Sequence, residues 1–134
     1  MVLALCVMLF ASCTVIEKKE PAESLGKAIV SVYVDDEERY ILEDEAVEIT
    51  EGDTAFDVLQ KAVQENKIHM EFEGNGKDAY VVGIDNLYTF DKGENSGWLF
   101  YLNGESSTVG AGNLEVSDGD MVEWRFVADW TKAE

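Results

Sequence analysis

The feature that most constrains this fold is an aromatic-rich segment at residues 96–124, SGWLFYLNGESSTVGAGNLEVSDGDMVEW. It contains two strand-like runs. The first ends at Asn103-Gly104 and the last begins after Asp118-Gly119, and both dipeptides favour tight turns between strands. Side chains alternate along a strand, so both faces of the first run are apolar but only one face of the last run is. The segment therefore predicts the core of a β-sheet, with Phe100 and Trp124 buried.

A glycine-rich loop, ESSTVGAGN at residues 105–113, joins these runs. Small side chains and glycines let a backbone approach another surface closely. Two interpretations stay open: a tight connection that passes a neighbouring segment, or a loop that contacts a ligand. Trp98 has the same two alternatives, since it either fills the core or lies at an exposed aromatic surface.

The preceding segments predict a hairpin, one helix and further strands. Alternation at residues 28–34 indicates a strand, the acidic residues 35–38 a turn, and residues 40–42 with 46–50 the returning strand. Residues 54–66 form an amphipathic helix with Phe56, Leu59 and Val63 on one stripe, capped by Asp53 or Thr54. Strands follow at 68–73 and 79–84, then a loop at 85–95. This order favours an α+β, β-grasp-like mixed sheet with the amphipathic helix packed on one face.

Three motifs carry a family resemblance. They are G-W-x-F-Y-x-N-G from residue 97, V-G-A-G from residue 109, and D-G-D-x-V-E-W from residue 118. This pattern resembles the bacterial transcobalamin-like C-terminal domain, which is similar to the small β-rich domain of transcobalamin and intrinsic factor, the vitamin B12 carriers. The resemblance covers residues 28–127 and implies a β-grasp-like fold.

The resemblance also implies a ligand and a site. In the vitamin carriers this domain covers one side of cobalamin, and the carriers' larger helical domain holds the other side. The matching surface is formed by a tryptophan and a loop, which makes the candidate ligand-binding residues Trp98, Thr108, Val109, Gly110, Ala111, Gly112 and Asn113. No cofactor is expected beyond a corrinoid ligand.

The N-terminus predicts export and lipidation. Residues 1–12 are almost wholly apolar and end in Ala11-Ser12 before Cys13, as in a bacterial lipoprotein signal peptide. No basic residue precedes the apolar run, so the true start lies upstream or the signal is weak; a plain secretory signal is the alternative. We expect residues 13–27 to be a lipidated cysteine with a flexible tether and residues 28–130 to be the folded domain.

Charge and side-chain chemistry exclude several functions. The formal net charge is −18, which argues against nucleic acid and against anionic lipid, so we expect membrane attachment through the lipid alone. The acidic residues 35–38 and the loop 85–95 lack the spacing of a calcium site. His69 is the single histidine, and the cysteines are Cys6 and Cys13, so we expect no metal site and no catalytic residues.

The sequence thus predicts a monomeric, lipid-anchored, extracytoplasmic module at the cell membrane that binds a small molecule, with a corrinoid as the named candidate. The alternative is a cell-surface module that binds a protein or glycan and no small molecule. We expect a binding protein and not an enzyme, although fold alone does not choose between these functions.

Overall fold

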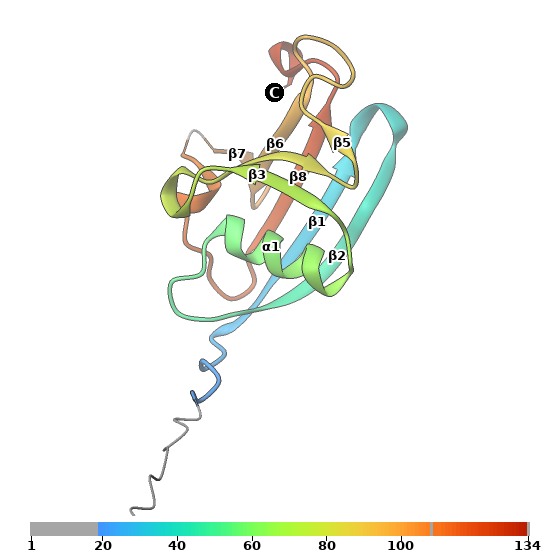
Figure 1. Cartoon of the computed structure of the whole chain (residues 1–134). Coiled ribbons are helices and arrows are strands. Elements are labelled where there is room, and N and C mark those ends of the chain that lie inside the picture. Colours follow the sequence, from blue (N-terminus) through green and yellow to red (C-terminus); the bar gives the residue numbers. More distant parts are fainter. Residues whose placement is uncertain (1–18, 108, 134) are drawn as a thin grey trace, which may run out of the picture.

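The architecture is α+β, built on a five-stranded mixed sheet in the order β2-β1-β8-β6-β7 (Figure 1). This computed structural model describes residues 19–107 and 109–133. A second, three-stranded sheet has the order β3-β4-β5. The strands are β1 (Gly26–Val34), β2 (Arg39–Ile49), β3 (Met70–Glu73), β4 (Tyr80–Ile84), β5 (Leu87–Tyr88), β6 (Gly97–Leu102), β7 (Glu105–Ser106) and β8 (Met121–Val127). The helices are α1 (Ala55–Glu65) and four 3-10 turns, η1 (Asp35–Glu37), η2 (Gly76–Asp78), η3 (Ala111–Asn113) and η4 (Trp130–Lys132).

The first and last strands lie side by side and parallel at the centre of the larger sheet. Val30 pairs with Val122 and Val32 with Trp124, and all four are at most 3% exposed. β2 and β6 flank this pair in antiparallel orientation. This arrangement confirms the predicted β-grasp-like fold, with a single α-helix among residues 19–107 and 109–133.

Helix α1 begins where the sequence predicts it to begin. The Thr54 hydroxyl accepts a hydrogen bond from the Asp57 backbone N–H (3.3 Å), and the Asp57 carboxylate accepts one from the Thr54 N–H (2.9 Å). This reciprocal capping box satisfies two N–H groups that the first turn leaves free. The buried side of the helix holds Ala55, Phe56, Val58, Leu59, Ala62 and Val63.

Asp53 ties the helix to the end of β2. Its carboxylate accepts hydrogen bonds from the backbone N–H (2.7 Å) and hydroxyl (3.1 Å) of Thr50, and it pairs with the Lys61 ammonium. Burial raises the pKa of the Asp53 carboxyl, but the bonds from Lys61 and Thr50 outweigh burial and hold this pKa below its ordinary value of 3.8. The charged form of Asp53 therefore stabilises the fold.

Asp53→Asn is expected to lower the free energy of unfolding at pH 7 by about 1 kcal/mol, because it removes the charge while keeping the shape. The contribution of Asp53 is complete above pH 3.8 and is lost as the pH falls through the lower pKa of the folded state, so the two proteins should converge in strong acid. Urea unfolding at pH 7 and at a series of falling pH values below 3.8 measures this. The matched control is Glu51→Gln, an exposed carboxylate nearby, and an equal loss in both variants would contradict the assignment.

Three segments differ from the sequence-based prediction. The returning strand is continuous over Arg39–Ile49, with an irregular register opposite Val30 and Val32. There Asp44 has a φ of +47°, and its N–H donates to the Ser31 hydroxyl (3.0 Å), so a side-chain bond holds the bulge inside the strand. The strand predicted from residue 68 begins at Met70, and the predicted loop 85–95 contains the short strand β5. Phe72, predicted to point inward, is 39% exposed and packs by its edge against Phe56.

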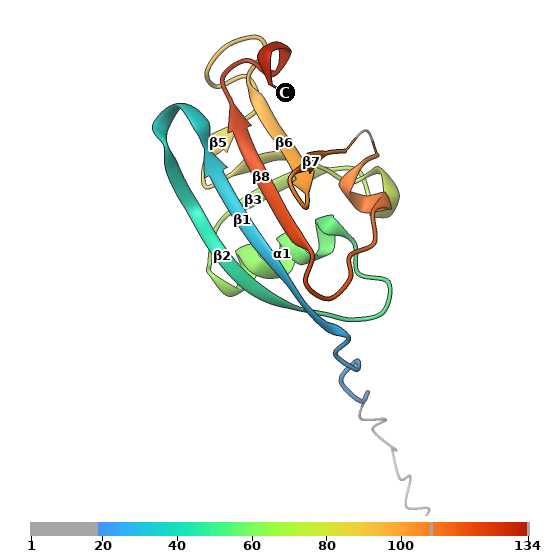
Figure 2. The same cartoon turned by 180° about the vertical axis from the view of Figure 1, so that it is seen from behind.

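The larger sheet is covered on one face only. Helix α1 and the smaller sheet lie over the same face, and the view from behind shows β2, β1, β8 and β6 uncovered (Figure 2). On that open face Arg125 pairs with Asp35 (2.9 Å) and lies over the rings of Tyr33 and Tyr101 (5.6 and 5.8 Å to the centroids).

The predicted signal peptide, residues 1–12, and the predicted lipidation site Cys13 lie outside the described residues. The end of the predicted tether is ordered, since Leu25 N–H donates to the Ile49 carbonyl (2.8 Å) and β1 begins at Gly26. Within residues 19–107 and 109–133, no helix has the length and apolar character needed to cross a membrane.

Candidate ligand-binding site

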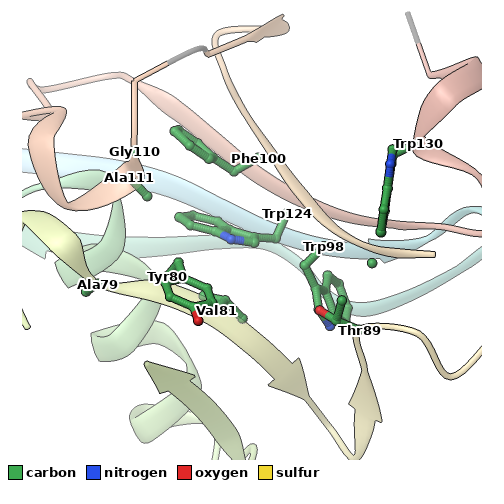
Figure 3. A pocket seen from close by; sticks show the side chains of 11 residues that line it. Ala79, Tyr80, Val81, Thr89, Trp98, Phe100, Gly110, Ala111, Trp124 and Trp130 are labelled. Carbon is green, nitrogen blue, oxygen red and sulfur yellow. The ribbon is translucent and has the colours of Figure 1, made fainter. Parts of the chain in front are cut away.

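A pocket of about 270 Å³ opens where the smaller sheet, β6, β8 and the glycine-rich loop meet (Figure 3). Its wall is mostly aromatic and small side chains. The lining residues are Ala79, Tyr80, Val81, Thr89, Gly97, Trp98, Phe100, Gly110, Ala111, Trp124 and Trp130.

Trp124 lies at the centre of this wall and belongs to the core. It is 3% exposed and stacks on Phe100 of the adjacent strand, with ring centroids 5.2 Å apart and an interplanar angle of 24°. The two rings meet because Phe100 and Trp124 are register partners of β6 and β8. The predicted burial of Trp124 is confirmed, and Phe100 is half-buried against the same core.

Trp98 combines both roles that the sequence left open. Its ring packs edge-on against the fully buried Phe126, with centroids 5.3 Å apart, and its indole N–H donates to the Leu87 carbonyl (2.9 Å). The side chain is thereby fixed while one part of it faces the pocket (Figure 3). Trp98 is an immobilised pocket wall and also part of the core packing.

Gly97 allows two side chains from other segments to close the pocket. A Cβ at this position would lie 3.2 Å from the Trp130 ring and 3.3 Å from the Thr89 methyl group. Trp130 is held by its backbone N–H, which donates to the Asn95 carbonyl (2.8 Å). Sequence reasoning assigned no site role to Trp130, Thr89, Tyr80, Ala79 or Val81, because no local pattern marks which distant segments pack beside residue 97.

The glycine-rich loop passes close to a neighbouring segment and also lines the pocket. Gly110 and Ala111 line the pocket. Gly112 is buried against the turn of η2, where a Cβ would lie 2.2 Å from the Gly76 carbonyl oxygen. Asn113 also holds the loop against η2, because its side-chain amide donates a hydrogen bond to the Lys77 carbonyl (2.7 Å). Of the remaining candidates, Val109 is 46% exposed outside the pocket lining, and Thr108 lies outside the described residues.

The pocket is electrically neutral, since none of its lining residues is an acid, lysine, arginine or histidine. The Tyr80 hydroxyl donates to the Glu73 carboxylate, and this bond, with burial and the Glu73 charge adding to it, raises the pKa of Tyr80. Ligand pockets commonly enclose about 300–1,000 Å³. The arrangement suits contact with one uncharged face of a ligand larger than the pocket itself.

The two acidic segments considered for calcium are engaged in other contacts. Asp35 pairs with Arg125, and Lys92 lies 2.8 Å from carboxylate oxygens of both Asp36 and Glu37. In the loop 85–95, Asp91 accepts a hydrogen bond from the Tyr88 N–H (2.8 Å). Over the ranges 19–107 and 109–133, no three acidic, histidine or cysteine side chains gather in a way that could hold a metal ion.

The fold and the pocket define the class as a small β-grasp-like α+β domain with an aromatic pocket at the edge of its helix-covered face. Residues 52–128 match the family described as a domain of unknown function, DUF4430, and the chain belongs to this family. No curated protein matches it by sequence.

The solved structures that share the fold include two proteins of low sequence identity to this chain. One is haptocorrin in complex with Cbi, at 22% identity and a TM-score of 0.64, where the match covers 76% of this chain and 25% of haptocorrin. The other is a candidate metal binding protein from Ruminococcus gnavus ATCC 29149, at 21% identity and a TM-score of 0.55, covering 76% of this chain and 96% of that one. This chain therefore corresponds to about a quarter of haptocorrin. The transcobalamin-like character predicted from the motifs is consistent with both matches.

Proposed function

We propose that this chain is a non-covalent ligand-binding module that takes one side of a corrinoid in its aromatic pocket. The observation that carries the proposal is that Trp98 and the loop residues Gly110 and Ala111, singled out from the sequence, line one pocket. The fold shared with haptocorrin, a protein solved in complex with Cbi, supports a corrinoid over other ligands of similar size.

The shape of the pocket supports contact with a single face of the ligand. Trp98 and Trp124 are fixed by packing before any ligand arrives, so binding costs little side-chain entropy. At about 270 Å³ the pocket encloses only part of a corrinoid. The module therefore binds weakly by itself, or it binds together with a partner that covers the other side of the ligand.

Equilibrium dialysis of the full chain in detergent against cobalamin and cobinamide tests the proposal. Saturable binding is expected, and Trp98→Ala should weaken it about tenfold, because the variant removes an aromatic contact with the ligand. The matched control is Tyr40→Ala, which removes a 44%-exposed aromatic side chain from outside the pocket and should leave the dissociation constant unchanged.

Absence of saturable binding up to 1 mM ligand, a free energy of only about −4 kcal/mol, would overturn the corrinoid proposal. Equal weakening of corrinoid binding by Trp98→Ala and Tyr40→Ala would instead mean that the ligand does not bind specifically in this pocket. In that case a pull-down of binding partners, comparing the unaltered chain with Tyr40→Ala, would test the open sheet face.

A protein or glycan partner is the second candidate function, and the open face of the larger sheet favours it. Tyr33 and Tyr40 pack together there, with centroids 4.7 Å apart, and Arg125 lies over Tyr33. An uncovered sheet face with aromatic and arginine side chains is typical of interaction surfaces. Loss of partner capture in Tyr40→Ala but not in Trp98→Ala would favour this function.

The proposed location is the outer side of the cell membrane, with the domain anchored as a monomer through a lipid on Cys13. The support is the sequence pattern at residues 1–13. Incorporation of a labelled fatty acid that is abolished by Cys13→Ala tests this step independently of ligand binding. Release of unlabelled, signal-cleaved protein would favour a plain secretory signal.

A further inference from the structure

A second pocket, of about 390 Å³, adjoins the first and belongs to the smaller sheet. It is lined by Glu73, Tyr80, Val82, Tyr88, Thr89 and Phe90, so Tyr80 and Thr89 separate it from the aromatic pocket described above. Nothing in the proposed corrinoid contact uses its other residues.

The register of β3, β4 and β5 brings tyrosine rings and the Glu73 carboxylate together in this second pocket. Glu73 pairs with Tyr80 across β3 and β4, and Gly83 pairs with Tyr88 across β4 and β5. A Cβ at Gly83 would lie 2.5 Å from carbons of the Tyr88 ring, so the glycine lets this ring lie flat against the sheet. Tyr80 is 54% exposed and presents its ring to solvent.

Phe90 completes the pocket in a conformation that bulky residues rarely adopt. Its φ is +73°, and its side chain is 63% exposed. The backbone is fixed on both sides, because Phe90 N–H donates to the Ser96 carbonyl (2.9 Å) and the Phe90 carbonyl accepts from Gly93 N–H (3.3 Å). The fold thus holds a largely exposed phenyl ring at the pocket edge, where it also packs edge-to-face against the Trp130 ring, with centroids 5.9 Å apart. Strained and exposed positions of this kind cluster at ligand sites.

The charge of this pocket is negative and uncompensated. Glu73 lines it, no lysine or arginine does, and within the described ranges Glu73 has no ion pair. The hydrogen bond to Glu73, burial and the charge of Glu73 raise the pKa of Tyr80. Burial first, and then the charge of Glu71, raise the pKa of Tyr88. The carboxylate charges that contribute to both pKa increases favour a positive ligand group here.

We propose that this second pocket binds an organic cation, with an ammonium group against the rings of Tyr80, Tyr88 and Phe90 and beside the Glu73 carboxylate. Aromatic faces carry negative charge density and attract cations within about 6 Å of the ring centre. A bare metal ion fits poorly, because calcium takes six to eight oxygen ligands and only one carboxylate lines the pocket. A neutral apolar ligand would gain nothing from Glu73. This site extends the proposed function and does not depend on it.

Nuclear magnetic resonance titration of the full chain in detergent with choline, compared with its neutral isostere 3,3-dimethyl-1-butanol, tests the proposal. Choline is expected to bind at least tenfold more tightly than the neutral compound and to shift resonances of residues 73–90. Added sodium chloride should weaken the binding. Equal affinity for the two compounds, or no binding of choline at 50 mM, would overturn the proposal.

Variants separate the roles of charge and ring. Glu73→Gln and Phe90→Leu should each weaken choline binding about fivefold, whereas Glu65→Gln, an exposed carboxylate at the end of α1, should not. Tyr80→Phe keeps the ring and frees the Glu73 carboxylate, so choline affinity should be kept or increased. If Tyr80→Phe weakens choline binding as much as Glu73→Gln does, Glu73 acts only by positioning Tyr80. The proposed direct contact between the Glu73 carboxylate and the cation would then be wrong. Corrinoid dialysis with Glu73→Gln reports on the first pocket separately, so either proposal can fail alone.

Discussion

Phe126→Ala is expected to lower the free energy of unfolding by about 3–5 kcal/mol, the range for removing a buried phenylalanine ring. Phe126 is 0% exposed in β8, and its ring meets the edge of Trp98 with centroids 5.3 Å apart. The substitution leaves a cavity that the surrounding strands cannot close, because β8 pairs with β1 on one side and β6 on the other. Urea unfolding followed by circular dichroism measures the change.

Met121→Ala is the matched control for this prediction, because Met121 lies in the same strand and is 56% exposed. It should change the free energy of unfolding by no more than about 0.5 kcal/mol. Comparable effects of the two substitutions would mean that the interior at Phe126 is more open than the packing indicates. Phe126→Ala should also loosen Trp98, which loses its ring partner but keeps its hydrogen bond to Leu87.

Gly112→Ala is expected to cost about 1–3 kcal/mol, the usual penalty of overpacking. The new methyl group would lie 2.2 Å from the Gly76 carbonyl oxygen and 3.2 Å from its carbon, and a backbone contact of that kind cannot be relieved by a side-chain rotation. The loop would have to move away from η2, which would strain the hydrogen bond from Asn113 to Lys77. Thermal unfolding and ligand dialysis of the variant measure both consequences.

Gly110→Ala is the matched control in the same loop. A Cβ there would meet its nearest neighbours at 3.6 and 3.9 Å, which is ordinary contact, and the φ of −58° suits alanine. Stability should therefore be unchanged, while the added methyl group narrows the aromatic pocket. A stable Gly112→Ala protein would show that the η2–η3 approach is adaptable and does not require glycine.

The two pockets differ in the chemistry that they offer to a ligand. The first is neutral and is built on rings that also stabilise the core, so substitutions at its centre affect both binding and folding. The second is built on the exposed rings of Tyr80 and Phe90 beside Glu73, so its variants should remain folded. This difference makes the second pocket the cleaner subject for mutagenesis.

Much of the fold follows from local patterns in the sequence. Alternation placed β1, β6 and β8, and a cap at Asp53 or Thr54 with the apolar stripe placed α1. The boundaries of β2 and β3 were predicted less well, because the Ser31–Asp44 bond and the positive φ at Lys67 depend on contacts that periodicity does not report.

The sequence by itself determined the α+β class and the buried face of each central strand, because side-chain period and turn chemistry are local properties. The resemblance of its motifs to the transcobalamin-like domain added Trp98 and the glycine-rich loop as a candidate site. Only the tertiary structure decided that Trp130 and Thr89 close the pocket through Gly97, and that Tyr80, Tyr88, Phe90 and Glu73 form a second one. Those neighbours come from segments far apart along the chain or from different strands, and their meeting depends on strand order and register, which local sequence patterns do not encode.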